Sequence, residues 1–205
     1  LILFILMSIV HFGLCDWSYL GLKKYKWSVS LTHGLNIVFG IIFFHTNETF
    51  EIFTFLSNLS FNQFQEYLYI IYICYFFLLI RYAYLAIKFT RLRWGILEMS
   101  IILLVIFLTE PLVAFSIYFC FIHTFKHVRS ILKDTSKYLS NNKFITITTI
   151  SFTILTWVGG SLAIIYLHKS FSFDESFIKT LFIGLAALTL PHMTLVDIFY
   201  RRKFN

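Results

Sequence analysis

The sequence is poor in charged residues: Asp, Glu, Lys and Arg make up 13% of its 205 residues, whereas hydrophobic residues make up 59%. The mean hydropathy is correspondingly high, at +0.79. This shortage of charge excludes an ordinary soluble domain, and no stretch of the chain is polar enough to form one. Cysteine is also scarce. Cys15, Cys74 and Cys120 lie within or at the ends of apolar runs, without a spacing that indicates disulfides or metal ligands.

Long apolar runs take up most of the chain. A hydrocarbon layer roughly 30 Å thick needs about 17 to 25 apolar residues per crossing helix, and runs of about this length recur. We therefore predict an all-α polytopic membrane protein, with one transmembrane helical domain over residues 1–205. We expect about seven transmembrane helices, at about 1–15, 27–46, 66–88, 94–109, 111–128, 144–168 and 177–200.

Two local features refine this prediction. Residues 48–64 mix aromatic and aliphatic side chains with polar ones, which is typical of an amphipathic helix that lies at the membrane interface. Glu110-Pro111 interrupts a long apolar run, because proline lacks a backbone N–H and clashes with the preceding turn. We expect a tight hairpin between two helices at this point.

The basic residues gather in alternate loops. The formal charge of +7 does not indicate a nucleic-acid partner, because the basic residues form short clusters between apolar runs rather than one basic face. We expect a multi-pass protein of the cell (inner) membrane, and the positive-inside rule places such loops in the cytoplasm. The loops on this side hold 14 of the 17 basic residues: Lys23, Lys24, Lys26, Lys88, Arg91, Arg93, Lys126, Arg129, Lys133, Lys137, Lys143, Arg201, Arg202 and Lys203.

Histidines are concentrated in one half of the predicted membrane. Five of the seven lie in the half nearer the basic loops: His11, His33, His123, His127 and His192. Ionisable groups inside a bilayer need a partner or a function. His123 and His127 are four residues apart, so their imidazoles share one helix face, which suits a metal, and in lipid both need either hydrogen-bonding partners or a metal. Neutral imidazoles suit iron, copper or zinc, and iron with an open position binds oxygen.

The remaining polar residues of this half allow two interpretations each. His11 either binds a metal or forms a hydrogen bond to a neighbouring helix, while Asp16 is placed to orient a ligand. His192 follows Pro191 and fits either a structural kink or a ligand role. We expect His33, beside Gly34, to serve in packing. Glu98 lies close to Arg93 in the sequence, so we expect an ion pair between them.

Three motifs resemble those of a known family, the Brp/Blh β-carotene 15,15′-dioxygenases. They are His-Phe-Gly-x-x-Asp at 11–16, Pro-Leu-Val-Ala-Phe-Ser-Ile-Tyr-Phe-Cys-Phe-Ile-His-Thr-Phe-Lys-His at 111–127, and Leu-Pro-His-Met at 190–193. The resemblance extends over essentially the whole chain. Lys126 stands where the family usually has arginine, which keeps the charge but loses the planar guanidinium.

The resemblance implies a membrane enzyme that cleaves β-carotene with O2 into two molecules of all-trans-retinal and supplies retinal to a microbial rhodopsin. It implies non-haem iron, Fe(2+), held by four histidines, of which His11, His123 and His127 are three. The fourth belongs to an N-terminal Pro-His-Gly-x-x-Asp stretch that these residues do not contain. Because the chain opens on Leu1 inside an apolar run, we expect a fragment that lacks the N-terminal helices. His192 is then a residue that supports a ligand, or a fourth ligand itself.

Two other classes compete with this interpretation. A membrane di-iron desaturase or hydroxylase of lipids needs about eight histidines in several boxes, and the chain has seven without a His-His pair. The second competing class is a non-catalytic carrier of retinoid or pigment, or a transporter. An opsin needs a lysine in mid-membrane, and a transporter is expected to show internal repeats or paired broken helices. The sequence places no lysine in mid-membrane, and it shows neither internal repeats nor paired broken helices.

Overall fold

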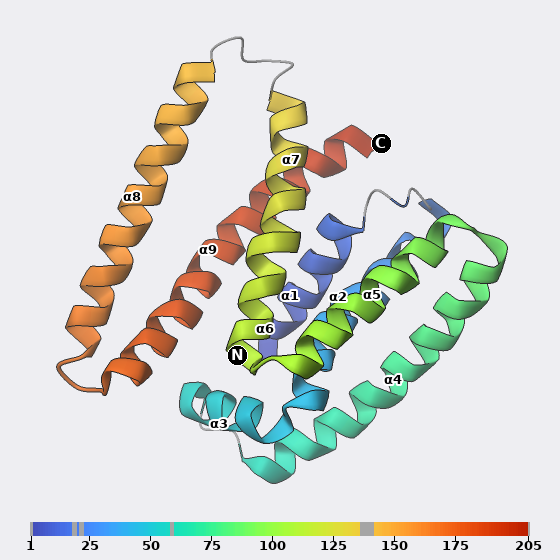
Figure 1. Ribbon diagram of the computed structural model, residues 1–205, viewed down its shortest axis with the longest axis horizontal. Helices are drawn as coiled ribbons and strands as arrows, with labels where there is room; N and C mark the ends of the chain where they lie inside the picture. The colour runs from blue at the N-terminus through green and yellow to red at the C-terminus, as the bar shows by residue number, and fades with distance from the viewer. Residues whose placement is uncertain (1, 18–19, 21–22, 58–59, 136–141, 205) are drawn as a thin grey trace. The chain divides into compact units, whose positions relative to one another are not determined.

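A computed structural model describes residues 2–17, 20, 23–57, 60–135 and 142–204, and within them every regular element is helical (Figure 1). The predicted all-α class is confirmed. The elements are α1 (Ile2–Asp16), η2 (Lys23–Tyr25), α2 (Lys26–Phe44), α3 (Thr46–Ser57), α4 (Phe61–Lys88), α5 (Arg91–Leu108), α6 (Pro111–Ile117), η3 (Tyr118–His123), α7 (Thr124–Thr135), α8 (Asn142–Leu167) and α9 (Phe173–Phe204). The chain forms two compact units, Leu1–Ile131 and Leu132–Asn205.

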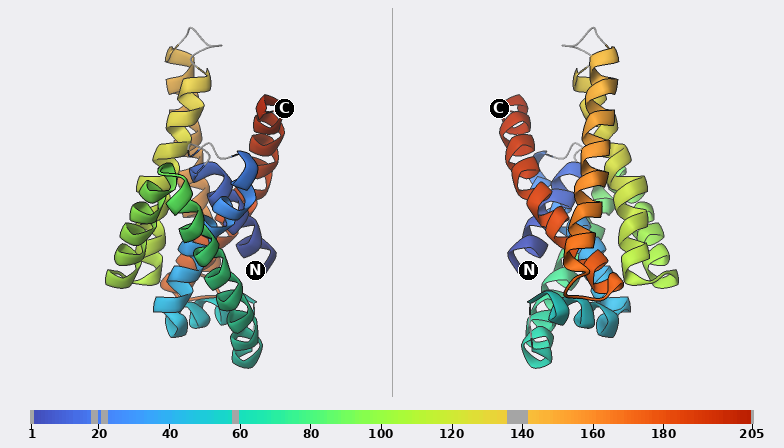
Figure 2. Two further views of the ribbon diagram at one scale, coloured as in Figure 1. Left: turned by 90° about the vertical axis from the view of Figure 1, so that its right-hand side faces the viewer. Right: turned by 90° about the vertical axis from the view of Figure 1, so that its left-hand side faces the viewer.

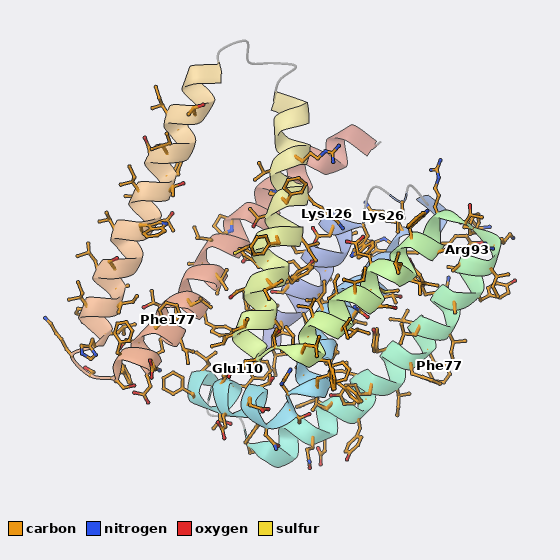
Figure 3. The ribbon with its side chains drawn as sticks, viewed as in Figure 1. Lys26, Phe77, Arg93, Glu110, Lys126 and Phe177 are labelled. Carbon is orange, nitrogen blue, oxygen red and sulfur yellow. The ribbon has the colours of Figure 1, made fainter. Side chains whose placement is uncertain are left out.

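Each of the predicted apolar segments coincides with helical structure. Among the described residues, four helical stretches are long and apolar enough to cross a membrane: Lys26–Phe44, Gln65–Lys88, Pro111–Arg129 and Thr146–Leu167. Such helices are compatible with a membrane protein. The surface of α4 agrees with this, because large apolar side chains such as Ile73, Phe76 and Phe77 are exposed on it. Figure 3 labels Phe77 among them. The total of seven crossings stays a prediction.

The helix predicted at 48–64 is α3, and it ends earlier than expected, at Ser57. Its apolar side chains do not all face outward. Phe53 is buried, and Phe50 and Ile52 pack on the same cluster, which includes Phe39 of α2 and Leu68 of α4. The amphipathic pattern therefore reflects packing of α3 against the protein as well as any contact with lipid.

The predicted break before Pro111 is confirmed. α5 ends at Leu108, Glu110 has an extended backbone, and Pro111 occupies the first turn of α6, where its missing N–H is not needed. The chain thus reverses between α5 and the helical segment that carries His123 and His127.

Two glycines allow α1 and α2 to cross with their backbones in contact. A β-carbon at Gly13 would lie 2.1 Å from the Ser30 carbonyl oxygen, and one at Gly34 would lie 1.9 Å from the Ile9 carbonyl oxygen. The contact is reciprocal, since each helix offers a glycine to the backbone of the other. Small residues at a helix crossing permit this approach in membrane proteins. The crossing fixes the last two turns of α1, which carry His11 and Asp16.

The second unit is a hairpin of α8 and α9, visible in two orientations (Figure 2). The start of α9 is capped by a reciprocal pair: the Ser172 N–H donates to Glu175 Oε2 at 2.9 Å, and the Glu175 N–H donates to Ser172 Oγ at 3.3 Å. This is a capping box, which satisfies two of the first backbone donors of a helix.

Candidate active site

Three histidines from two distant segments come together in the first unit. His11 lies on α1, His123 ends η3, and His127 lies one turn further on α7. The ring centres of His11 and His123 are 5.1 Å apart, those of His11 and His127 are 6.5 Å apart, and those of His123 and His127 are 5.8 Å apart. The last two rings are nearly parallel, at 5°. The shared face predicted from their spacing is therefore present, and α1 supplies the third imidazole.

Asp16 holds the His123 ring. Its side chain is 1% exposed, and its Oδ1 lies 2.9 Å from His123 Nδ1. The other oxygen, Oδ2, accepts a hydrogen bond from the Tyr118 hydroxyl. Both carboxylate oxygens are thus occupied by donors from η3. The sequence placed Asp16 near a ligand but did not identify which one, and it gave no indication of Tyr118.

The π-helical turn of η3 explains how Tyr118 and His123 reach one carboxylate. They are five residues apart, which in an α-helix of about 3.6 residues per turn places them on different faces. A π-helix has i→i+5 hydrogen bonds and aligns such residues, and such turns often occur at functional sites. The segment Tyr118–His123 contains neither proline nor glycine, so nothing in its sequence indicates this geometry.

Lys126 joins this cluster to α5. Its Nζ forms an ion pair with Glu98, donates to the Asp16 carbonyl oxygen at 3.4 Å, and lies 4.4 Å from the centre of the Trp17 ring (Figure 3). The expectation that Glu98 would pair with Arg93 is therefore corrected. Arg93 instead donates from Nε to the Ala86 carbonyl oxygen at 3.3 Å. The sequence spacing indicated Arg93 on the same helix as the partner of Glu98, whereas the tertiary fold supplies Lys126 from α7.

Glu98 and Lys126 should be energetically coupled, so replacing both should destabilise the protein less than the two single replacements combined. Each side chain is only about a quarter exposed, so Lys126→Met leaves a poorly solvated carboxylate, and Glu98→Met leaves a poorly solvated ammonium. We expect each single variant to lose about 1–3 kcal/mol of stability. The double variant should lose less than the sum of the two. Thermal unfolding in detergent measures this, and strictly additive losses would show that the pair contributes no coupling.

The other histidines of the first unit have structural partners. His33 is fully buried, its ring stacks on Trp17 at 3.4 Å between centres, and its Nε2 lies 3.0 Å from the Tyr82 hydroxyl. The packing role expected for it is confirmed. His45 Nε2 lies 2.7 Å from the Ile106 carbonyl oxygen, where it closes the end of α2 against α5. The side chain of His192 lies outside the described residues, so its role stays a prediction.

The donor chemistry of the three imidazoles fits a transition metal. Two imidazoles on one ion, each bound at about 2.1 Å, have ring centres roughly 4.5–6.5 Å apart, and the three measured separations lie in this range. The side chains as oriented do not form a closed set, because within the described residues no three His, Cys, Asp or Glu side chains converge as a metal site. Side-chain rotation is therefore needed to bring three nitrogens onto one ion. The carboxylate on His123 Nδ1 is the usual companion of a metal-binding histidine.

The fold and the site together define the class of protein. It is an all-helical protein of apolar helices that carries a buried cluster of histidines with a carboxylate. Comparison with known proteins identifies the family. A family model described as beta-carotene 15,15′-dioxygenase matches residues 1–200. A curated beta-carotene 15,15′-dioxygenase from uncultured marine bacterium 66A03 is 29% identical over 201 residues, which cover 98% of this chain and 72% of that protein. No solved structure matches the chain. The chain belongs to the β-carotene 15,15′-dioxygenase family, a family of carotenoid-cleaving enzymes.

Proposed function

We propose that this protein cleaves β-carotene at its central double bond with O2, giving two molecules of all-trans-retinal, and that His11, His123 and His127 hold the iron(II) for this reaction. One observation carries the assignment of the residues. In a chain of this family, imidazoles from α1 and from the η3–α7 segment lie within 6.5 Å of one another, ring centre to ring centre.

The protein's own groups prepare the site. The Asp16 carboxylate accepts a hydrogen bond from His123 Nδ1–H, which leaves the Nε2 lone pair available as a ligand. Three neutral imidazoles leave the positive charge of an ion uncompensated, and a bound iron(II) would supply the activation of O2. His11 and His123 are both buried, so bulk water has little access to the proposed ligands.

Two observations support β-carotene as the substrate: the name of the matched dioxygenase and the apolar surface of this chain. The matched protein is named for β-carotene, a hydrocarbon that dissolves in the bilayer rather than in water. We place the chain in the cell membrane as a multi-pass protein, with its basic loops in the cytoplasm. Retinal released there is available to a microbial rhodopsin as chromophore.

Expression of the full-length gene in bacteria that accumulate β-carotene tests the reaction. We expect the pigment to be consumed and retinal to be the product, because cleavage at the central bond of a symmetric molecule gives two identical halves. Chromatography of extracts from induced cells and from cells with an empty vector measures both compounds. Unequal apocarotenals would reject central cleavage, and unchanged β-carotene would reject the proposed activity.

A further inference from the structure

The Tyr118 hydroxyl completes the hydrogen bonding of the carboxylate that holds His123. Tyr118 is 2% exposed and donates to Asp16 Oδ2, while His123 Nδ1 occupies Asp16 Oδ1. Both contacts come from the same π-helical turn. A buried carboxylate oxygen without a donor is unfavourable by about 1–3 kcal/mol, so Asp16 has a strong preference for the orientation that keeps both partners.

We propose that Tyr118 is a positioning residue for the metal ligand His123, which it controls through the orientation of Asp16. With Oδ2 bound to the tyrosine hydroxyl, Oδ1 accepts a hydrogen bond from His123 Nδ1–H, which holds the ring in place and leaves Nε2 available as a ligand. This inference rests on the proposed function, because it presupposes that His123 binds the metal.

The alternative role for Tyr118 is to fill space in the core. Its ring packs at 5.3 Å from that of Phe12, in an edge-on arrangement within the main apolar cluster. Phenylalanine keeps this ring and its packing but lacks the hydroxyl. Tyr118→Phe therefore separates the two roles, since only the positioning role requires the O–H group.

The matched control is Tyr75→Phe. The Tyr75 hydroxyl donates to Asn36 Oδ1 at 2.6 Å, so this variant also removes one tyrosine hydrogen bond to a side-chain oxygen between helices of the first unit. Neither Tyr75 nor Asn36 contacts the histidine cluster in the contacts described for it. Both variants should lower thermal stability, and only Tyr118→Phe should affect the metal.

The experiment measures iron(II) affinity of the purified full-length protein by competition with a chelator. Loss of a group that holds a metal ligand typically weakens metal binding by about 10–100-fold, and we expect this for Tyr118→Phe with no change for Tyr75→Phe. Because Tyr118 acts through Asp16, Tyr118→Phe should add little once Asp16→Asn is present. The kcat for β-carotene should fall with the affinity while KM changes little.

Each outcome has a definite meaning. If Tyr118→Phe binds iron as tightly as the wild type and merely loses the stability that Tyr75→Phe loses, the hydroxyl has only a structural role and the inference is wrong. An equal further loss of affinity in the Asp16→Asn background would also overturn it, because Tyr118 would then act by another route. If the wild-type protein binds no iron, the proposed function fails, and this inference fails with it.

Discussion

Alanine at His123 should abolish retinal formation and reduce the iron content of the purified protein to background. The side chain is central to the cluster, because its ring centre lies 5.1 Å from that of His11 and 5.8 Å from that of His127, and its Nδ1 contacts Asp16. Its removal deletes one proposed ligand and leaves Asp16 Oδ1 without its donor. The loss of activity should exceed the roughly 100-fold typical of a residue that merely supports a ligand. Retinal chromatography and metal analysis by mass spectrometry give the two measurements.

His168→Ala is the matched control for the His123 variant. His168 is exposed in the second unit, where its ring contacts Phe173 at 6.3 Å between centres. This variant should keep both iron and activity. If His123→Ala retained iron, the ligand assignment would be wrong. Two irons per wild-type chain would instead favour the di-iron desaturase or hydroxylase class.

The helices and the pairing of His123 with His127 follow from local patterns in the sequence. Apolar runs of membrane length predict helices without knowledge of tertiary contacts, and Pro111 marks a helix start because its chemistry is local. The four-residue spacing of the two histidines fixes their common face for the same reason. The position of His11 beside them depended on the family resemblance and on the depth of each residue in the predicted membrane.

The partners within the site were not predictable, because they depend on backbone geometry and on contacts between distant segments. Tyr118 reaches Asp16 only through a π-helical turn, and a single sequence has no marker for it. Glu98 pairs with Lys126 of α7 rather than with a neighbour on its own helix, and that pair depends on the tertiary fold. In the same way, α3 packs its Phe53 on the protein, where periodicity alone indicated a membrane surface.

Alanine at Gly34 should strongly destabilise the first unit. The added β-carbon would lie 1.9 Å from the Ile9 carbonyl oxygen and 2.8 Å from its carbonyl carbon, and these are backbone atoms that cannot rotate away. Helices α1 and α2 would have to separate, which we expect to lower stability by about 3 kcal/mol, at the upper end of the usual range for overpacking. Thermal unfolding in detergent measures the change.

Gly159→Ala and Gly160→Ala are the controls, because a β-carbon at either position meets no atom of the described residues within 4 Å. Both should be neutral or slightly stabilising, since alanine favours a helix over glycine by roughly 1 kcal/mol. A Gly34→Ala protein as stable as these two would mean that α1 and α2 do not cross in backbone contact.

Gly13→Ala tests whether the crossing of α1 and α2 controls the geometry of the proposed metal site. Its β-carbon would lie 2.1 Å from the Ser30 carbonyl oxygen, and Gly13 stands between His11 and Asp16 on the same helix. A shift of α1 away from α2 therefore moves a proposed ligand and the carboxylate that orients His123 at the same time. Because a displacement of about 1 Å can reduce catalysis roughly 100-fold, iron affinity and retinal formation should fall even at temperatures where the variant stays folded. Normal activity in folded Gly13→Ala protein would show that the site tolerates a displaced α1, and that its geometry is set by the η3–α7 segment alone.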